Sequence, residues 1–293
     1  MAVRRVVIPP DADGMKTGLF LRRFLPALPE SILRKVFSAR DVKLDGVRVS
    51  RDTPVMAGQE LSVYLPASAE NTESLQVVWE DDDILLVNKP AGISVESDDP
   101  GNLSLTDLCR IHVESHFSES GLFFKPAACH RLDNKTSGLC LFAKNEQALL
   151  ILQNAFHLRT MEKYYTCLVR GIMKPPSAVC EAWLIKDAAN AMVSVLDHET
   201  PGARPIITGY ETLESGQVSR LRVHLITGRT HQIRAHLAAL GHPVLGDDVY
   251  GDRVFNHQQK VRSLRLCATE LTIRTNGRLP NLENRSFQIN PPF

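Results

Sequence analysis

Short apolar segments rich in β-branched and aromatic residues recur along this chain, and no regular series of helices separates them. The clearest of these strand candidates are residues 84–87, 139–143, 164–169 and 220–226. An amphipathic helix is expected after Asn145, which can cap it, and another from about 230 to 240, before Gly241. Strands that outnumber helices without alternating with them predict an α+β fold with a largely antiparallel, mixed sheet.

The first part of the chain has the pattern of a small basic module. Two amphipathic helices are expected there, with apolar faces made by Leu19, Leu21, Phe24 and Leu25 and by Ile32, Leu33, Val36 and Phe37. Residues 42–49 then alternate with period two around Asp45-Gly46, which predicts a hairpin, and 58–65 predict a closing strand. Residues 1–67 carry 11 Lys and Arg against 7 Asp and Glu, although the whole chain has a net charge of only +1.

This order of two helices and a hairpin resembles the ribosomal S-four-type (alpha-L) RNA-binding domain, in which basic side chains on the helices contact structured RNA. The resemblance implies an RNA-docking domain at 1–67, joined by a polar linker at 68–74 to a catalytic domain at 75–293. Arg22 and Ile32 depart from that family, which usually has Asp and often has Arg at these positions. A helical cap without an RNA role is the alternative.

The composition, with 43% hydrophobic and 23% charged residues, is that of a globular protein. No segment approaches the roughly 20 apolar residues of a membrane helix. The apolar run at the N-terminus stops at Pro9 and Pro10, too early for a secretion signal. We therefore expect a cytoplasmic, monomeric protein with no membrane partner. The six cysteines include no Cys-x-x-Cys pair, so reduced thiols are expected rather than a zinc ribbon or a disulfide framework.

Residues 130–138, His-Arg-Leu-Asp-Asn-Lys-Thr-Ser-Gly, lead directly into the expected strand at 139–143. Asp133 lies there between Arg131 and Lys135. Positive neighbours favour the ionised form of a carboxylate, which can then act as a nucleophile or base without a metal. The alternative is a turn aspartate that binds backbone amides. The segment at 88–92, Asn-Lys-Pro-Ala-Gly, predicts only a rigid turn.

Residues 227–237, Thr-Gly-Arg-Thr-His-Gln-Ile-Arg-Ala-His-Leu, place many polar side chains at the start of an expected helix. Metal binding is the rival interpretation, because His231, His236 and His242 lie close in sequence. However, His231 and His236 are five residues apart, which puts them roughly 140° apart around a helix. Zinc-binding helices use a spacing of four, and a phosphate loop would need a Gly-x-x-x-x-Gly-Lys frame. We expect neither a metal nor a cofactor.

Together, segments 130–138 and 228–251 resemble the RluA-type pseudouridine synthases, which modify ribosomal and some transfer RNAs. Segments 88–92 and 162–171 fit the same family, and the resemblance covers roughly residues 75–275. Cys267 departs from it, because the family more often has His there. The resemblance implies an isomerase that breaks the C1′–N1 bond of uridine and rejoins the base through C5. Its partner would be RNA, with ribosomal RNA favoured and transfer RNA possible.

The resemblance also implies roles for individual residues. Asp133 would be the nucleophile, Arg234 its ion-pair partner, and Tyr165 the aromatic residue that packs against the target base. Tyr164 is the alternative tyrosine, although on a strand it points to the opposite face. Whether Asp133 attacks C1′ or assists elimination from the sugar stays open.

Five further residues are expected to bind the substrate. Arg131 would enter the space that the flipped nucleotide leaves in the RNA helix, since a planar guanidinium can stack there. The other four are His130, Arg229, His231 and Gln232.

Three other function classes compete with this interpretation. A glycosidase-like hydrolase would need a second carboxylate beside Asp133, where the motif has Lys135. A non-catalytic RNA-binding protein would not need Asp133. A metallohydrolase is disfavoured by the histidine spacing.

Overall fold

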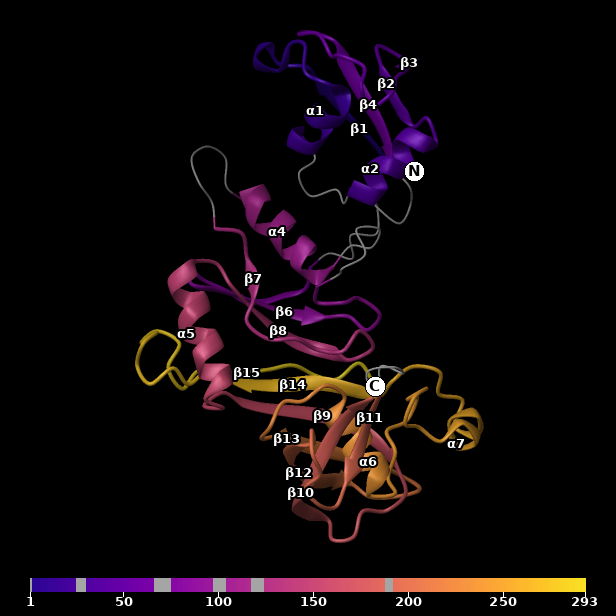
Figure 1. Ribbon diagram of the computed structural model, residues 1–293, viewed down its shortest axis with the longest axis vertical. Coiled ribbons are helices and arrows are strands. Elements are labelled where there is room, and N and C mark those ends of the chain that lie inside the picture. Colours follow the sequence, from indigo (N-terminus) through magenta and orange to yellow (C-terminus); the bar gives the residue numbers. More distant parts are fainter. Residues whose placement is uncertain (1, 25–29, 66–74, 97–103, 117–123, 188–191) are drawn as a thin grey trace. The chain divides into compact units, whose positions relative to one another are not determined.

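The computed structural model describes residues 2–24, 30–65, 75–96, 104–116, 124–187 and 192–293 (Figure 1). The chain forms two compact units, one made of Met1–Leu75 and Glu96–Phe123 and the other of Gln76–Val95 and Phe124–Phe293. The linker expected at 68–74 lies outside the described residues, and the expected domains at 1–67 and 75–293 stay a prediction.

The smaller unit contains an antiparallel four-stranded sheet in the order β1-β4-β2-β3. The β2–β3 hairpin turns at Asp45 and Gly46, with φ of 49° and 79°, as a two-residue turn between antiparallel strands requires. The elements of this unit are β1 (Ala2–Val7), the 3-10 helix η1 (Pro10–Ala12), α1 (Thr17–Phe24), α2 (Glu30–Ser38), β2 (Val42–Leu44), β3 (Val47–Arg48), β4 (Glu60–Leu65) and α4 (Leu105–His116).

The core of the smaller unit is closed by apolar side chains of α1 and α2 against the sheet. The face expected for α1 was partly wrong, because Leu19 is 55% exposed whereas Phe20 is 3% exposed. Phe20 and Phe24 are four residues apart and their rings stack at 5.9 Å, so the buried stripe runs through them and Leu21. Leu25 lies outside the described residues.

The larger unit is built on a mixed sheet in the order β11-β10-β12-β13-β9-β14-β8-β6-β5, with β7 and β15 paired to β8 and β14. Only the β14–β8 pair is parallel among the pairs of the described chain, which confirms the mixed, largely antiparallel α+β fold. The strands are β5 (Val77–Glu80), β6 (Ile84–Lys89), β7 (Ala127–Ala128), β8 (Ser137–Ala143), β9 (Glu162–Arg170), β10 (Ser177–Asp187), β11 (Met192–Leu196), β12 (Arg204–Glu214), β13 (Val218–Leu225), β14 (Leu266–Thr272) and β15 (Ser286–Gln288). The helices are α5 (Glu146–His157), α6 (Gln232–Ala239) and α7 (Arg253–Gln258).

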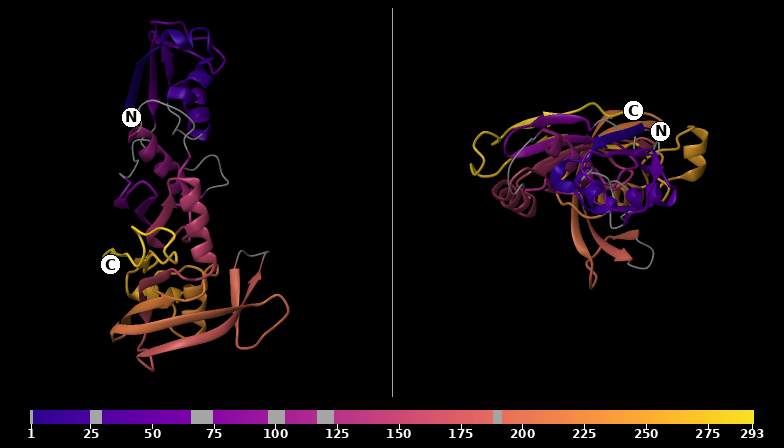
Figure 2. Two further views of the ribbon diagram at one scale, coloured as in Figure 1. Left: turned by 90° about the vertical axis from the view of Figure 1, so that its left-hand side faces the viewer. Right: turned by 90° about the horizontal axis from the view of Figure 1, so that it is seen from above.

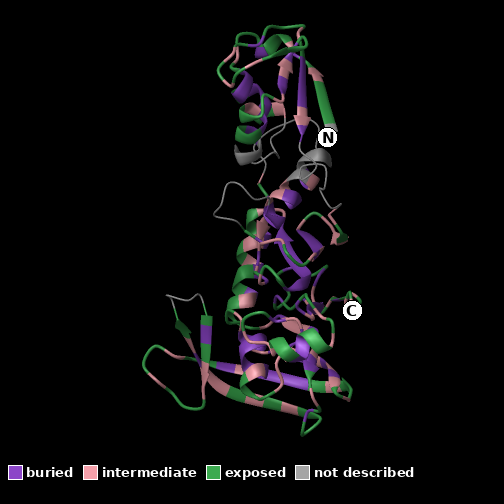
Figure 3. Cartoon of the chain, turned by 90° about the vertical axis from the view of Figure 1, so that its right-hand side faces the viewer, coloured by how far each residue is buried: buried purple, intermediate pink, exposed green. Residues whose placement is uncertain are grey.

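Strand β8 lies at the centre of the main core, and all seven of its residues are buried. Helix α5 packs against it through Ala148, Leu152 and Ala155. The same core contains buried residues of the neighbouring strands β6 and β14 (Figure 3). The expected cap of α5 is confirmed, because Asn145 Oδ1 accepts the backbone N–H of Ala148 at 2.8 Å. At the β11 edge of the sheet, the β10–β11 hairpin extends away from the remaining strands of the unit (Figure 2).

Gly138 lies where the backbone of β14 comes too close to β8 to leave room for a side chain. Its φ is +115°, and a Cβ atom there would lie 2.2 Å from the carbonyl oxygen of Ala268. Only glycine satisfies both conditions. The parallel pairing joins Ser137 and Gly138, the last two residues of the 130–138 segment, to β14 and so fixes where that segment enters the sheet.

Candidate active site

Asp133 lies on a tight turn between β7 and β8, where its side chain remains 25% exposed. The turn is closed by a hydrogen bond of 3.1 Å from Thr136 N to the Asp133 carbonyl oxygen. Asp133 therefore stands at the end of the most buried strand of the unit but presents its carboxylate toward solvent. A carboxylate that is accessible and held on a rigid element is suited to react with a bound substrate.

Arg234 brings α6 to this carboxylate. Its side chain is 4% exposed, and Nη1 lies 3.3 Å from Asp133 Oδ2. The same guanidinium binds Asp247 through Nε at 2.7 Å and Nη2 at 2.9 Å. Arg234 thus bridges a completely buried carboxylate and a partly exposed one.

Asp247 is the anchor of this arrangement. In addition to binding Arg234, Asp247 accepts hydrogen bonds through Oδ1 from the backbone N–H groups of Val249 and Tyr250, at 2.9 and 3.0 Å. Burial alone would raise the pKa of Asp247, but the hydrogen bonds and charge of Arg234 outweigh it and the pKa is lowered. Burial alone would likewise lower the pKa of Arg234, but the hydrogen bonds and charge of Asp247 outweigh burial and the pKa is raised. Both groups are therefore charged at neutral pH, and the orientation of Arg234 is set before a substrate arrives.

Lys89 holds the Asp133 turn from the other side. Its side chain is completely buried, and Nζ donates to the carbonyl oxygens of Pro90 at 3.0 Å, Ile93 at 2.7 Å and Asn134 at 2.9 Å. Gly92 N adds a hydrogen bond of 2.8 Å to Asn134 O. Burial lowers the pKa of Lys89 to about 8, although the charge of Asp133 opposes the shift. The 88–92 turn therefore supports the turn of Asp133.

The sequence did not identify Lys89, Asp247 or Tyr250 as parts of the site. Lys89 and Asp247 are charged residues that are buried, and the fold brings Lys89 to Asn134 and Asp247 to Arg234. A buried charge needs compensation, so a lysine at the end of an apolar strand was a usable signal. Lys135 gives a second link between the Asp133 turn and the segment that contains Asp247, since its Nζ lies 2.5 Å from Oδ2 of Asp248.

The two tyrosines of β9 point to opposite faces of the sheet. Tyr165 is 6% exposed, and burial together with the charge of Asp133 raises its pKa. Tyr164 stacks on His224 at 4.5 Å and lies 3.7 Å below the guanidinium of Arg222. The nearby charge of Asp133 thus acts on Tyr165, the tyrosine that the resemblance selected.

His130 and Gln232 are occupied by contacts within the protein. His130 Nε2 accepts the backbone N–H of Leu141 at 3.1 Å, and burial lowers its pKa to about 3, so the ring is neutral. Gln232 is 2% exposed; its Oε1 accepts from Thr227 Oγ1 at 2.9 Å and its Nε2 donates to Thr208 Oγ1 at 3.0 Å. Both side chains hold the segments that carry the site.

The other expected substrate-binding residues lie nearer to solvent. Arg131 and Arg229 are exposed. His231 is half-buried, with Nε2 3.8 Å from Asp133 Oδ2. In the described ranges, no group of three or more His, Cys, Asp or Glu side chains is arranged to hold a metal ion. Among the same residues, no helix is long and apolar enough to cross a membrane.

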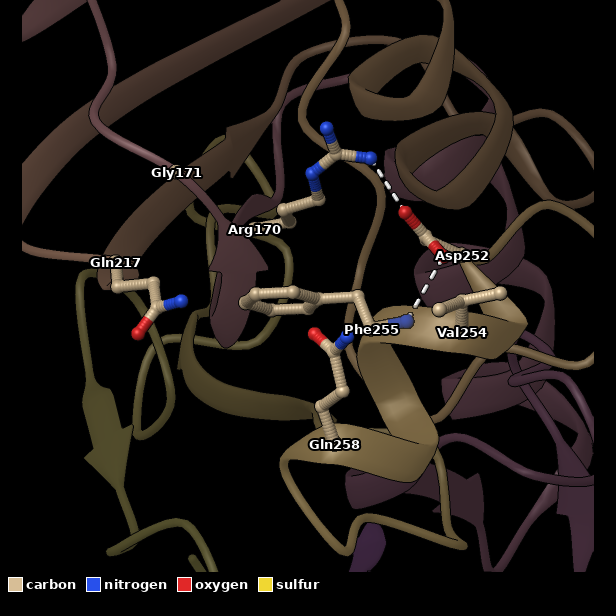
Figure 4. A pocket seen from close by; sticks show the side chains of 7 residues that line it. All are labelled: Arg170, Gly171, Gln217, Asp252, Val254, Phe255 and Gln258. Carbon is tan, nitrogen blue, oxygen red and sulfur yellow. Dashed lines mark hydrogen bonds and ion pairs between the residues drawn. The ribbon is translucent and has the colours of Figure 1, made fainter.

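A separate hollow of about 360 Å³ lies at the end of β9 (Figure 4). Arg170 and Asp252 form an ion pair at its rim, and the Phe255 ring forms part of its wall. None of the residues described around Asp133 lines it. The full lining consists of Arg170, Gly171, Gln217, Asp252, Val254, Phe255 and Gln258.

Comparison with known proteins gives consistent matches. A model of the RNA pseudouridylate synthase family matches residues 83–239. Ribosomal large subunit pseudouridine synthase C of Vibrio vulnificus is 33% identical over 270 residues, which cover 87% of this chain and 82% of the relative. An uncharacterized RNA pseudouridine synthase of Mycobacterium bovis is 35% identical over 260 residues, covering 86% and 83%. The solved structure of human RNA pseudouridylate synthase domain containing 1 is similar with a TM-score of 0.61 and 27% identity, covering 78% of this chain and 87% of the human one.

These matches confirm the resemblance to RluA-type pseudouridine synthases and the expectation of an enzyme. The matched family region includes Asp133, Tyr165 and Arg234. It covers more than half of the sequence, and the relatives align over most of their own length. The chain therefore belongs to the RNA pseudouridylate synthase family.

Proposed function

We propose that this enzyme converts specific uridines of large-subunit ribosomal RNA to pseudouridine, with Asp133 as the reacting carboxylate. The observation that carries the proposal is the single accessible contact between Asp133 and the buried Arg234–Asp247 pair. Because Arg234 is already bound to Asp247, it can orient Asp133 without swinging away. A rigid, charged and accessible carboxylate is what this isomerisation needs.

The reaction leaves the atomic composition of the nucleoside unchanged. The C1′–N1 bond breaks, and the uracil leaves with the bonding electron pair. The base turns, C5 bonds to C1′, the proton on C5 is released and N1 gains a proton. Asp133 could attack C1′ or take a proton from the sugar; either role requires a charged carboxylate and exclusion of water from the intermediate.

Tyr165 is proposed to pack against the target base. Its raised pKa keeps the phenol neutral, so the ring offers an uncharged aromatic face beside Asp133. Arg131 and Arg229 are exposed and are proposed to contact the RNA, with Arg131 filling the space of the flipped nucleotide. For His130 and Gln232 we propose a supporting role, in place of the substrate contact that the resemblance implied, because their polar atoms already bind the protein.

The choice of ribosomal RNA rests on the relatives. The protein of Vibrio vulnificus and a protein of Escherichia coli that is 31% identical are both named ribosomal large subunit pseudouridine synthase C. Transfer RNA is the second candidate substrate. The basic module at 1–67 is proposed to add RNA affinity, and the cytoplasm is the proposed compartment.

The proposal is tested by Asp133→Asn. Asparagine is close to isosteric with aspartate but lacks the negative charge and the nucleophilic oxygen, so the turn should persist while the reaction stops. Tritium release from RNA labelled at uracil C5 measures the reaction, and an RNA titration on the same preparation measures binding. The matched control is Asp197→Asn, which changes an exposed aspartate bonded only to its neighbour His198 among the described contacts. Release by Asp133→Asn within about tenfold of wild type would remove Asp133 from the mechanism.

A further inference from the structure

Tyr250 joins three segments of the larger unit at one hydroxyl group. Its Oη accepts the backbone N–H of Val193 on β11 at 3.0 Å and lies 3.0 Å from Nδ1 of His231. The two rings meet edge to face, with their centroids 5.6 Å apart and their planes at 75°. On its other side the His231 ring faces Asp133. A continuous series of contacts therefore leads from β11 through Tyr250 and His231 to the reacting carboxylate.

The contacts of the Tyr250 hydroxyl favour one tautomer of His231. Its oxygen already accepts from Val193 N, and its single proton is free to be donated to Nδ1. A neutral imidazole that accepts at Nδ1 carries its own proton on Nε2, which faces Asp133 Oδ2. The other tautomer would direct the Nε2 lone pair at a carboxylate oxygen. Burial lowers the pKa of His231, with Arg234 adding to the shift while Asp133, Asp247 and Asp248 oppose it, so the neutral ring is favoured.

The backbone of His231 is held in an unusual conformation. It has φ of 55° and ψ of 14°, in the left-handed region, directly before α6. Residues with a Cβ atom rarely adopt this conformation, so surrounding contacts must hold it. Ala235 of α6 packs in one apolar cluster with Val193 and Tyr250, so the first turn of the helix and β11 hold His231 in place. In this conformation Nε2 of the ring lies 3.8 Å from Asp133 Oδ2.

We infer that His231 is a catalytic hydrogen-bond donor and that Tyr250 is the positioning residue that fixes its tautomer. The inference rests on the proposed function of the site. At 3.8 Å the Nε2–Oδ2 separation is too long for a hydrogen bond, so the N–H group stays available beside the reacting carboxylate. When the C1′–N1 bond breaks, negative charge spreads to O2 and O4 of the departing uracil. The Nε2–H group stabilises that charge by a hydrogen bond and keeps its proton.

Activity measurements separate this role from a merely structural one. His231→Ala should lower kcat about 100-fold, in the range seen when one donor to a developing negative charge is removed. His231→Gln should recover at least about tenfold of that loss, because the glutamine amide donates from a position close to Nε2. Tyr250→Phe should lower kcat about tenfold in the wild-type background but by less than about twofold beside His231→Gln, since an amide has no tautomers. RNA affinity should change little in each variant.

The tautomer itself is measured by nitrogen chemical shifts of the His231 ring in full-length, nitrogen-15-labelled protein. We expect a proton on Nε2 in the wild type and a mixture of tautomers in Tyr250→Phe. The control variant is Tyr210→Phe, which removes a phenol that donates to Pro175 O at 3.0 Å and leaves His231 untouched. It should match the wild type in both measurements.

A wild-type His231 ring protonated on Nδ1 would overturn the inference. The inference would also be wrong if Tyr250→Phe and His231→Ala kept wild-type kcat while Asp133→Asn was inactive. The shift measurement needs no substrate, so it distinguishes this inference from the proposed reaction. Wild-type protein that releases no tritium from any RNA would contradict the proposed function while leaving the tautomer result in place.

Discussion

Arg234 and Asp247 form a buried bidentate ion pair, with Nε and Nη2 at 2.7 and 2.9 Å from the two carboxylate oxygens. Both side chains are almost completely shielded from solvent, at 4% and 0% exposed. The third nitrogen, Nη1, is left to contact Asp133. The pair therefore acts as a preassembled support, and of the two carboxylates that Arg234 binds only Asp133 is accessible to a substrate.

Replacing Arg234 by Met should damage catalysis more than RNA binding. It removes the group that orients Asp133 and leaves Asp247 buried without its partner. Breaking a buried ion pair from one side costs about 3–5 kcal/mol, so the free energy of unfolding should fall by that amount. Tritium release should fall at least about 100-fold, while the RNA dissociation constant changes less than about threefold.

Arg222→Met is the matched control for Arg234→Met. Arg222 also forms a bidentate pair, with Glu270 at 2.8 and 2.7 Å, but the two side chains are 34% and 23% exposed, and the Arg222 guanidinium lies on the face of Tyr164. A partly exposed pair contributes about 1 kcal/mol or less. Equal loss of activity in the two variants would show that Arg234 has no specific role.

Gly138→Ala should destabilise the larger unit more than an ordinary glycine substitution. The new Cβ would meet Ala268 O at 2.2 Å and would also require a residue with φ of +115°. The clash adds roughly 1–3 kcal/mol to about 1 kcal/mol for the conformation. Gly202→Ala separates the two effects, since φ there is +87° and no atom lies within 4 Å of the added Cβ. Urea unfolding of both variants measures the difference, and equal losses would contradict the close approach of β8 and β14.

The sequence predicted the parts of the fold that depend on local pattern. The apolar runs rich in β-branched and aromatic residues became β6, β8, β9 and β13, and Asn145 caps α5 as expected. The expected helix at 230–240 was found as α6 at Gln232–Ala239. It begins later because His231 adopts a left-handed conformation, which tertiary contacts impose and local sequence does not indicate.

Contacts between distant segments are much harder to predict from the sequence. The parallel β14–β8 pair joins residues about 130 positions apart, and periodicity carries no signal for such a pairing. Asp247 lies in the 228–251 segment that carried the resemblance, yet its neighbour Asp248 has the same side chain. Only the structure shows that Asp247 binds Arg234 whereas Asp248 is half-exposed and binds Lys135.

The basic module is expected to contribute RNA contacts that depend on salt. Lys35 and Arg40 are exposed at the end of α2 and directly after it. If both contact phosphates, replacing them with Gln should reduce the slope of log affinity against log salt by up to about 1.8. Turnover of saturating RNA should not change. Lys16→Gln is the control, because Lys16 is already paired with Asp52 at 3.0 Å; an unchanged slope in the double variant would favour the cap alternative.

Lys89 should make the stability of the protein depend on pH above neutrality. Its pKa is about 8 in the folded protein against 10.5 for the unperturbed group, so between these values the unfolded state binds more protons. The free energy of unfolding contributed by Lys89 should therefore rise with pH across this window, by up to about 3 kcal/mol at 1.4 kcal/mol per pH unit. Urea unfolding of wild type and Lys89→Met at several pH values measures the contribution as a difference.

Lys89→Met removes the titrating group, so the difference in unfolding free energy between the two proteins should change between about pH 8 and 10.5 and be constant below that window. Activity should move in the opposite direction. A neutral amine has two N–H groups for the three carbonyl oxygens that Lys89 now binds, so the hold on Asn134 and the Asp133 turn weakens as Lys89 loses its proton. Wild-type kcat should therefore fall above about pH 8 while stability does not. A pH-independent difference between wild type and Lys89→Met would show that Lys89 stays charged throughout this range.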